Sequence, residues 1–406
     1  MDQLDRSDTS YDLIENGLDT TTALFRRLTS LVRKQAFLNA FCAYDILQSS
    51  IKYASTGIPP EPAGKVRLCK QFTTIGKALN SNADKFIEYG DKVTVVGIDD
   101  IGIAIVYTLL AQGITNNICM IDMNEEVLEG EHLDLQSSAF FLNNPKIVSS
   151  KDPCESRDSK VCIVTTGTFK GRDEDDLDYV TRNAGIARAI VTPLANYSPN
   201  AIFILASEPV DILCYVTWKL LGVPKNRIIG TGTLMDTARF RYLLSDKFGV
   251  SPDSCHAYII GQHGPHFSVP VWSSVNVAGV LLKDLNPQIG SDKDPECWFE
   301  LYNDAVNAEN LVRNLKGCVT WSLALGVANI CKCIFNNSNK ILPVSTYVKG
   351  EHSIKDEVFL SLPCVVGANG VTNIIRQNLT EHETTVLRRG AENTAELQMA
   401  TKKIIS

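Results

Sequence analysis

A histidine between two glycines is the first feature of this chain that suggests chemistry. His263 stands in the segment Gly261-Gln262-His263-Gly264, directly after an apolar run at 257–260. Flanking glycines let the backbone turn sharply and approach a small ligand, and an imidazole exchanges a proton near neutral pH. The segment is therefore a candidate for proton transfer, although a single loop histidine is more often an ordinary packed or surface residue.

A carboxylate and a guanidinium share one helical face a little earlier in the chain. Residues 227–243 read as a strand, a glycine turn and a helix, and Asp236 and Arg239 lie three residues apart in that helix. Residues at this spacing are neighbours on a helix surface. The two side chains can therefore point into the same space.

The composition is that of a globular protein with a large core. The chain has 406 residues, 44% of them apolar, and a net charge of -7 without a basic cluster, which argues against nucleic acid as a partner. Its twelve cysteines show no Cys-x-x-Cys pair, so the pattern indicates neither a zinc site nor a disulfide framework. We expect a reducing compartment, and no apolar run reaches the roughly 18 residues that span a bilayer.

The N-terminal region differs from the rest of the chain. Residues 1–20 are acidic and are expected to be disordered, and 21–44 carry basic residues with apolar ones at helical spacing. This amphipathic helix either packs on the main body or acts as a targeting or membrane-surface helix; the first reading is favoured because targeting helices normally begin a chain. The proline-rich stretch 58–62 is typical of a stiff linker.

Strands and helices alternate regularly from Lys92 onward. The predicted strands end in a glycine turn after Val96, in Asp122, and in the segment after Thr165. Such alternation predicts a doubly wound parallel sheet with helices on both faces, a Rossmann-type α/β fold whose ligands lie beyond the carboxyl ends of the strands. The expected strands are 92–97, 117–122, 161–165, 201–205 and 227–229, and the helices are 101–110, 177–196 and 211–220.

The second half reads as a mixed α+β part that covers the open end of the sheet. Two helices are expected, at 304–315 and 321–335, followed by strands at 340–348 and 357–366. The turn at 367–370 would then lead to a closing helix around 381–405.

The motifs together resemble the lactate and malate dehydrogenases, and in particular the animal L-lactate dehydrogenases. The order and spacing of Asp236-x-x-Arg239 and Gly261-Gln262-His263-Gly264 are similar to that family, and the likeness extends from about residue 90 to the end. Further segments that resemble it are 210–213, 216–220, 224–227, 269–273 and 357–364.

This resemblance implies NAD as the cofactor and a 2-oxo acid or L-2-hydroxy acid as the substrate. His263 would give a proton to the carbonyl oxygen that receives the hydride, and Asp236 would orient the imidazole. Arg239 would grip the substrate carboxylate through two parallel hydrogen bonds. Asp122 would bind the ribose hydroxyls, with Gly97 and Gly102 forming the phosphate turn. Each residue also has a purely structural alternative. Asp236 would then be an acid at a helix start, Arg239 a surface charge and Asp122 a cap at a strand end.

The phosphate turn departs from the family pattern. It reads Gly97-Ile98-Asp99-Asp100-Ile101-Gly102, so Asp99 replaces the middle glycine. A carboxylate there adds bulk and like charge, at a cost on the order of 1–4 kcal/mol at contact distance.

The segment between Thr166 and Asn183 departs further. Its length matches the family, which aligns Asp176 with the arginine that polarises the substrate carbonyl, and Phe169 with an arginine near the cofactor phosphates. Lys170 aligns with the substrate-discriminating position and would favour a dicarboxylate. Arg172 is the nearby cation that would replace the missing one if the loop shifted.

Two more positions differ, and they leave the function open. Glu208 stands where the family has an asparagine, and Val319 where a threonine lines the pocket. One hypothesis is a lactate dehydrogenase-like enzyme with weakened activity; the alternative is a catalytically inactive binding protein or hetero-oligomer subunit.

The remaining expectations concern organisation. We expect a homo-oligomer, a tetramer or dimer, in the cytoplasm, with a mitochondrial location kept open by the basic segment 21–44. The expected divisions are a partly disordered extension at 1–70, an arm at 71–90, an NAD-binding domain at 91–232 and a catalytic domain at 233–406.

Overall fold

The computed structural model describes residues 90–171 and 173–405. The expectations for the acidic stretch 1–20, the helix at 21–44 and the linker at 58–62 lie outside these residues. So do the arm at 71–90, apart from Gly90, and the candidate cation Arg172.

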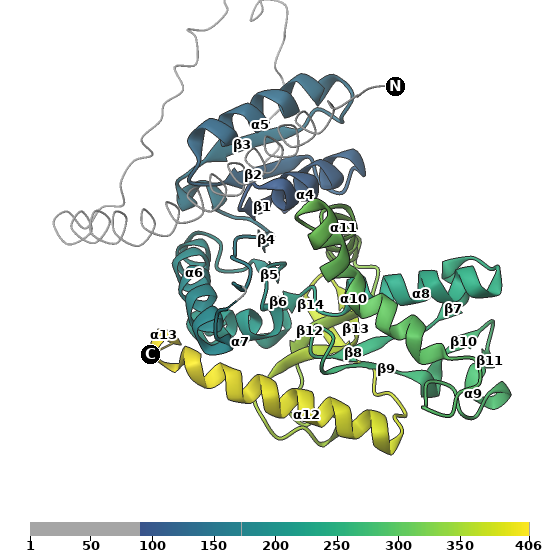
Figure 1. Cartoon of the computed structure of the whole chain (residues 1–406). Coiled ribbons are helices and arrows are strands. Elements are labelled where there is room, and N and C mark those ends of the chain that lie inside the picture. The colour runs from purple at the N-terminus through teal and green to yellow at the C-terminus, as the bar shows by residue number, and fades with distance from the viewer. Residues whose placement is uncertain (1–89, 172, 406) are drawn as a thin grey trace, which may run out of the picture. The chain divides into compact units, whose positions relative to one another are not determined.

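Six parallel strands form the first half of the fold, five of them at predicted positions (Figure 1). Neighbouring strands pair in parallel throughout this half. In their order across the sheet they are β3 (Lys146–Ser150), β2 (Asn117–Ile121), β1 (Val93–Val96), β4 (Val161–Val164), β5 (Ile202–Leu205) and β6 (Ile228–Gly230). The connections leave β1 in one direction and β4 in the other, which makes the edge between β1 and β4 the switch point where ligands bind in such sheets.

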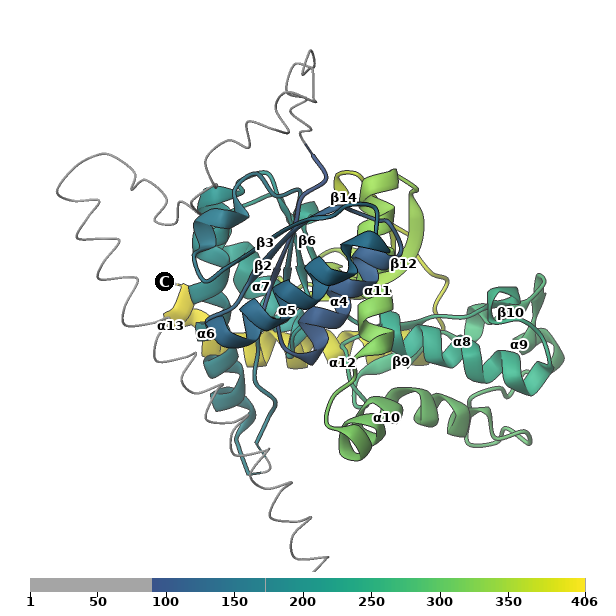
Figure 2. The ribbon, with the colours of Figure 1, turned by 90° about the horizontal axis from the view of Figure 1, so that it is seen from above.

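Helices cover both faces of these strands, which confirms the doubly wound fold. Right-handed crossovers that run in opposite directions along a sheet place their helices on opposite faces. The helices are α4 (Asp100–Ala111) and α5 (Glu125–Ser137) on one face, and α6 (Asp176–Tyr197) and α7 (Val210–Leu221) on the other. α6 packs on α7, and α4 packs on α11 (Trp321–Asn336) from the second half (Figure 2).

The edge strand β3 was absent from the predicted strands. Its side chains are exposed or only half buried, whereas β1, β4 and β5 are buried along their whole length. Because the fully buried strands carry continuous apolar runs and β3 does not, the sequence signal was weaker at this edge.

The second half extends the sheet, which the expectation that it covers the open end did not include. β12 pairs with β6 in antiparallel fashion through Ser345 and Gly230, and β13, β8 and β9 follow in order. This pairing supplies backbone partners to what would otherwise be an open edge. The added strands are β8 (Ile259–Gly261), β9 (Ser268–Pro270), β12 (Lys340–Tyr347), β13 (Phe359–Gly367) and β14 (Gly370–Ile374). A small separate sheet holds β7 (Cys255–His256), β10 (Asn276–Val277) and β11 (Val280–Leu281).

The turn at 367–370 joins two strands, and the closing helix begins at Glu381, as predicted. β14 pairs back on β13, so the turn closes a hairpin where a strand-to-helix passage was expected. The helices of this half are α8 (Leu234–Phe248), α9 (Leu282–Leu285), α10 (Trp298–Lys316), α11, α12 (Glu381–Gln398) and α13 (Lys402–Ile405). Among the helices of the described residues, none is both long and apolar enough to cross a bilayer.

Candidate active site

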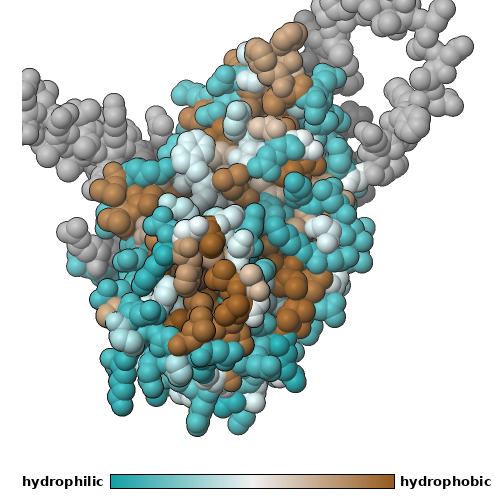
Figure 3. Space-filling view, turned by 90° about the vertical axis from the view of Figure 1, so that its right-hand side faces the viewer, coloured by the Kyte–Doolittle hydropathy of each residue, from teal (hydrophilic) through white to brown (hydrophobic). Residues whose placement is uncertain are grey.

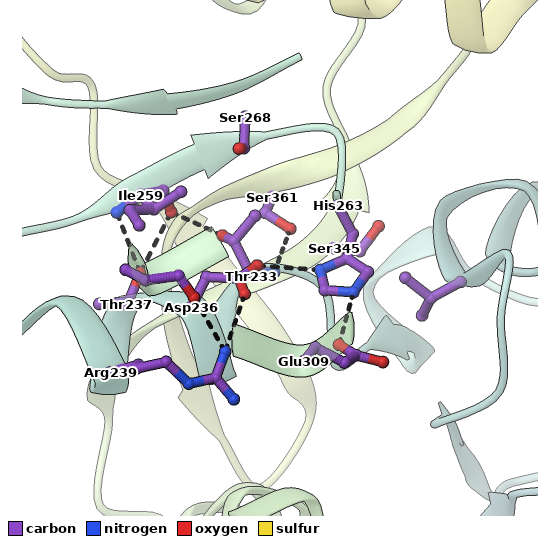
Figure 4. A network of polar contacts seen from close by, with 12 residues as sticks. Thr233, Asp236, Thr237, Arg239, Ile259, His263, Ser268, Glu309, Ser345 and Ser361 are labelled. Atoms are coloured by element: carbon purple, nitrogen blue, oxygen red, sulfur yellow. Dashed lines mark hydrogen bonds and ion pairs between the residues drawn. The ribbon is translucent and has the colours of Figure 1, made fainter. Parts of the chain in front are cut away.

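The start of α8 is tied to strand β8, which brings Asp236 beside the His263 loop (Figure 4). The hydroxyl of Thr233 donates to the carbonyl of Ile259 at 2.6 Å, and the hydroxyl of Thr237 accepts from the amide of Ile259 at 3.0 Å. His263 follows β8 by two residues. These buried bonds hold the helix and the histidine loop in one fixed relation.

His263 is held from two sides. Its ring Nδ1 lies 3.0 Å from Asp236 Oδ2, the contact that the resemblance implied. Its backbone amide donates to Asp211 Oδ2 at 2.9 Å, and Asp211 Oδ1 accepts from the hydroxyl of Ser345 at 2.5 Å. Asp236 is 1% exposed and Asp211 is 4% exposed, so both carboxylates act from inside the core.

Two further carboxylates face the other ring nitrogen. Glu208 Oε1 and Glu309 Oε2 each lie 3.3 Å from His263 Nε2. Glu208 belongs to the segment between β5 and α7, and Glu309 comes from α10. In the proposed chemistry this nitrogen would face the substrate oxygen, so the structure puts protein anions where a substrate group is expected.

Sequence reasoning missed Glu309 and its partner Arg313. Glu309 Oε1 accepts from Arg313 Nη2 at 2.6 Å, and the Arg313 guanidinium lies 4.3 Å from the centre of the Phe169 ring. The spacing of four residues is a recognisable helical ion pair. Nothing in that spacing shows that this face of α10 turns toward His263.

The surrounding carboxylates keep the imidazole charged. Burial alone would lower the pKa of His263, but Glu208 and Asp236 raise that pKa well above its ordinary value of 6.5. Burial opposes ionisation of Glu309 as well, yet the bond to His263 and the charges of His263 and Arg313 lower its pKa to about 2. The pair at the centre of the site is therefore an imidazolium and an ionised Glu309 at neutral pH.

Burial dominates for Glu208 and Asp211. It raises the pKa of Glu208 above its ordinary 4.5 in spite of the nearby imidazolium. It also raises the pKa of Asp211 to about 6. Glu208 thus accepts a proton before Glu309 does as the pH falls.

Arg239 lies beside Asp236, and one of its nitrogens already has partners within the protein. Its Nη1 donates to the carbonyl of Ala305 at 2.9 Å and lies 3.7 Å from Asp236 Oδ1. The prediction that Asp236 and Arg239 share one helical face is confirmed. The remaining nitrogens of Arg239, whose side chain is 18% exposed, are the ones that could reach a substrate carboxylate.

Lys170, which precedes α6, and Asp176 pair with each other rather than with His263. Lys170 Nζ pairs with Asp176 Oδ1 at 2.8 Å, and their side chains are 43% and 61% exposed. Asp176 is the first residue of α6, where an acidic side chain suits the positive end of the helix dipole. Val319 is half-buried in the connection between α10 and α11.

Two domain matches decide the family. Residues 91–230 match the lactate/malate dehydrogenase NAD binding domain, and residues 233–405 match the lactate/malate dehydrogenase alpha/beta C-terminal domain. The chain belongs to the lactate/malate dehydrogenase family. The resemblance read from the motifs is confirmed, and so is NAD as the cofactor, because the first of the two matched domains is the family's NAD-binding domain.

Individual members of the lactate/malate dehydrogenase family are similar over most of the chain. The L-lactate dehydrogenase B chain of Sceloporus undulatus is 42% identical over 334 residues, which cover 82% of this chain and 99% of the relative. The A chain of Danio rerio is 45% identical over 302 residues, 74% of this chain and 90% of the relative. The B chain of Homo sapiens is 43% identical over 314 residues, 77% of this chain and 94% of the relative.

The ribose side of the NAD site suits the cofactor of this dehydrogenase family. Asp122 follows β2, and its carboxylate accepts from the amides of Ile98 at 2.7 Å and Asn124 at 2.9 Å. Each oxygen keeps a second lone pair for a ribose hydroxyl. Asp122 is thus oriented by the turn it would share with the cofactor.

The glycines of the phosphate turn are required by packing. Gly97 has a φ of +97°, and a Cβ there would lie 2.5 Å from Thr166 Oγ1. A Cβ on Gly102 would lie 1.8 Å from the carbonyl oxygen of Gly97. Gly102 is therefore needed for the close approach of β1 and α4, and Gly97 for the approach of the turn to the segment after β4, whether or not a cofactor binds.

The pyrophosphate of NAD would have to displace an internal carboxylate from the phosphate turn. Asp99 Oδ1 accepts from the amides of Ile101 and Gly102, both at 3.1 Å, and so caps α4. Amides at the start of this helix are the groups that hold a pyrophosphate in dinucleotide-binding turns. An internal carboxylate already occupies them.

Proposed function

We propose that this chain is an NAD-dependent oxidoreductase of the L-lactate dehydrogenase type with weakened activity. It would interconvert pyruvate, or another 2-oxo acid, and the L-2-hydroxy acid. The observation that carries the proposal is the pairing of His263 with buried Asp236 at 3.0 Å, beside Arg239 on the same helix. That arrangement holds a proton donor and a carboxylate-binding guanidinium next to each other.

The residues divide into those that support turnover and those that oppose it. His263, oriented by Asp236, would transfer the proton, and Arg239 would bind the substrate carboxylate. Lys170 would contribute to the choice of substrate once the loop before α6 rearranges, because it now pairs with Asp176. Glu208 opposes turnover, since its carboxylate is one of two at His263 Nε2.

An inactive binding protein or hetero-oligomer subunit is the second candidate. The capping of α4 by Asp99 favours it, because the same amides would have to hold the cofactor pyrophosphate. Under this proposal the fold is kept for association, and the residues around His263 serve stability.

Titration of the purified full chain with NADH, followed by fluorescence, tests the cofactor half of the proposal. We expect Asp99→Gly to bind NADH at least about tenfold more tightly than the unchanged chain, since like charge at contact costs on the order of 1–4 kcal/mol. The lost cap should lower the free energy of unfolding by only a few tenths of a kcal/mol.

Asp99→Asn is the matched control, because asparagine caps a helix as well as aspartate but carries no charge. A gain in both variants identifies charge as the obstacle, and a gain in glycine alone identifies bulk. Measurable turnover of pyruvate or oxaloacetate by the unchanged chain would reject the inactive alternative. The absence of both NADH binding and turnover would reject the enzyme.

We also propose that the chain forms a homo-oligomer, a dimer or tetramer. Support comes from large apolar side chains that the described residues leave exposed on three helices and the turn after α5. They are Leu133, Phe140 and Phe141 at and after α5, and Leu311, Leu315, Trp321 and Leu325 on α10 and α11. Figure 3 shows apolar side chains gathered in patches on one face, the one that carries α8 and α9.

Sedimentation velocity should give two or four times the chain mass of 44.6 kDa. Leu325→Glu, with Leu325 53% exposed on α11, is expected to shift the species toward the monomer. Leu177→Glu on α6, 46% exposed and away from that face, is the control that should leave the assembly unchanged. A monomer in the unchanged chain would contradict the proposal.

Domain boundaries and location complete the proposal. We place the NAD-binding domain at 91–232 and the catalytic domain at 233–406, supported by the family matches at 91–230 and 233–405. We propose a cytoplasmic location, which suits the ten free cysteines of the described residues. The mitochondrial alternative rests on the segment 21–44.

A further inference from the structure

Glu309 joins the imidazole of the site to a second cation. Its Oε2 lies 3.3 Å from His263 Nε2, and its Oε1 accepts from Arg313 Nη2 at 2.6 Å (Figure 4 shows the contact with His263). The Glu309 side chain is 20% exposed and that of His263 is 13% exposed. The carboxylate therefore binds the imidazolium much as a small free carboxylate would, with a guanidinium on its other oxygen.

The helix that carries Glu309 is anchored on α8. Arg239 donates to the carbonyl of Ala305, which lies one turn before Glu309 on α10. α10 packs along α8 in the same region. Glu309 is thus held in place by the same arginine that would bind a substrate carboxylate.

An imidazolium Nε2 offers one proton and hence one strong hydrogen bond. A substrate oxygen and the Glu309 carboxylate cannot both take it. Because Glu309 is part of the chain, it competes for this proton at an effective concentration of roughly millimolar. The internal anion therefore has a standing advantage over a dissolved one.

We propose that Glu309 is an internal anionic ligand of His263 and the residue that excludes small carboxylate anions from the site. It is a specificity-determining residue, because the anion that reaches Nε2 must first displace it. The inference deepens the proposed function, on which it rests for the role of His263. It concerns occupancy of the site and requires neither NAD binding nor turnover.

The groups around the imidazole come from four parts of the fold. Asp236 faces it from α8, where Arg239 lies beside Asp236, and Asp211 reaches its backbone from α7. Glu208 follows β5, and Glu309 with Arg313 comes from α10. Removal of the Glu309 charge leaves Glu208, whose pKa burial raises, as the remaining carboxylate at Nε2. The cations Arg239 and Arg313 then attract an external anion.

Histidine ring signals measured by NMR test the proposal directly. The chain has six histidines, so ¹⁵N-histidine labelling of the full chain gives few signals, and the one lost in His263→Gln identifies His263. The probe is oxamate, a non-reacting analogue of a 2-oxo acid, added with and without NADH. We expect Glu309→Gln to show a saturable shift of the His263 signal at concentrations at least tenfold lower than the unchanged chain needs.

Asp304→Asn is the matched control, since it makes the same acid-to-amide change at an exposed position of α10. It should behave as the unchanged chain does. Glu309→Asp keeps the charge but shortens the side chain, so its oxamate affinity should lie between those of Glu309→Gln and the unchanged chain. It serves as the second variant if Glu309→Gln fails to fold. Equal oxamate affinity in the glutamine variant and the unchanged chain, or no shift in any variant, would overturn the proposal.

A failure of the proposed enzyme looks different. Absence of NADH binding and turnover, with oxamate still entering Glu309→Gln, would reject the enzyme and leave this inference standing. If the chain turns over pyruvate but oxamate leaves the His263 signal of Glu309→Gln unchanged, the enzyme stands and this inference is rejected.

Discussion

Combining Asp99→Gly, Asp176→Arg and Glu208→Asn should raise kcat/KM for pyruvate by a factor of roughly 10² to 10³ or more. Each change removes an anion from a position where the resemblance implies a glycine, an arginine or an asparagine. Asp176→Arg supplies the preorganised cation, at the loss of an exposed ion pair with Lys170 that is worth at most about 1 kcal/mol. Steady-state oxidation of NADH, followed by absorbance, measures the gain.

Asp178→Arg is the control for the charge reversal, because Asp178 is exposed two residues further along α6. It should leave kcat/KM unchanged. If the triple variant gains no more than this control does, the alignment of the loop before α6 is wrong, or the role given to it is. Since Glu309 still faces His263 Nε2 in the triple variant, adding Glu309→Gln should increase the gain further.

His263→Gln should destabilise the fold by about 3–5 kcal/mol at neutral pH, the usual cost of leaving buried charge without its partner. The imidazolium contacts Asp236 at 3.0 Å and both Glu208 and Glu309 at 3.3 Å. If His263 served catalysis alone, its removal would leave few unpaired carboxylates in the core and would cost little stability. Urea-induced unfolding, followed by the fluorescence of the four tryptophans, measures the difference.

The pH dependence has a definite sign. The pKa of His263 is raised in the fold, so its stabilisation is fully present below pH 6.5 and is lost as the pH rises through the higher folded value. The pKa of Glu309 is lowered from 4.5 to about 2, so its stabilisation is present above 4.5 and is lost as the pH falls toward 2. The variant should therefore differ most from the unchanged chain between pH 4.5 and the raised pKa of His263.

His266→Gln provides the comparison, because His266 is exposed three residues beyond His263. Its effect should stay within about 0.5 kcal/mol, as for other surface substitutions. An equally small effect of His263→Gln would mean that the carboxylates around the ring are not held by its charge.

Local patterns were enough for most of the elements. The apolar runs at β1, β4 and β5 are buried along their whole length, so they predicted strands correctly. The edge strand β3 and the hairpin strand β14 were missed. Both have mixed or exposed side chains, and their pairing depends on neighbours far along the chain.

For the candidate site residues as well, local features were predictable and contacts between distant segments were not. Sequence by itself determined that Asp236 and Arg239 share a helical face, since a three-residue spacing in a helix needs no tertiary contact. It also determined that Asp99 stands inside the phosphate turn.

Only the tertiary structure decided what surrounds His263. Glu208 and Glu309 are separated from it by 55 and 46 positions, as their numbers show, and they meet its Nε2 because β5, β8 and α10 converge there. No local rule links such positions, because their distance depends on how whole elements pack. The histidine was visible in the sequence, and the anions that occupy its free nitrogen became visible only in the fold.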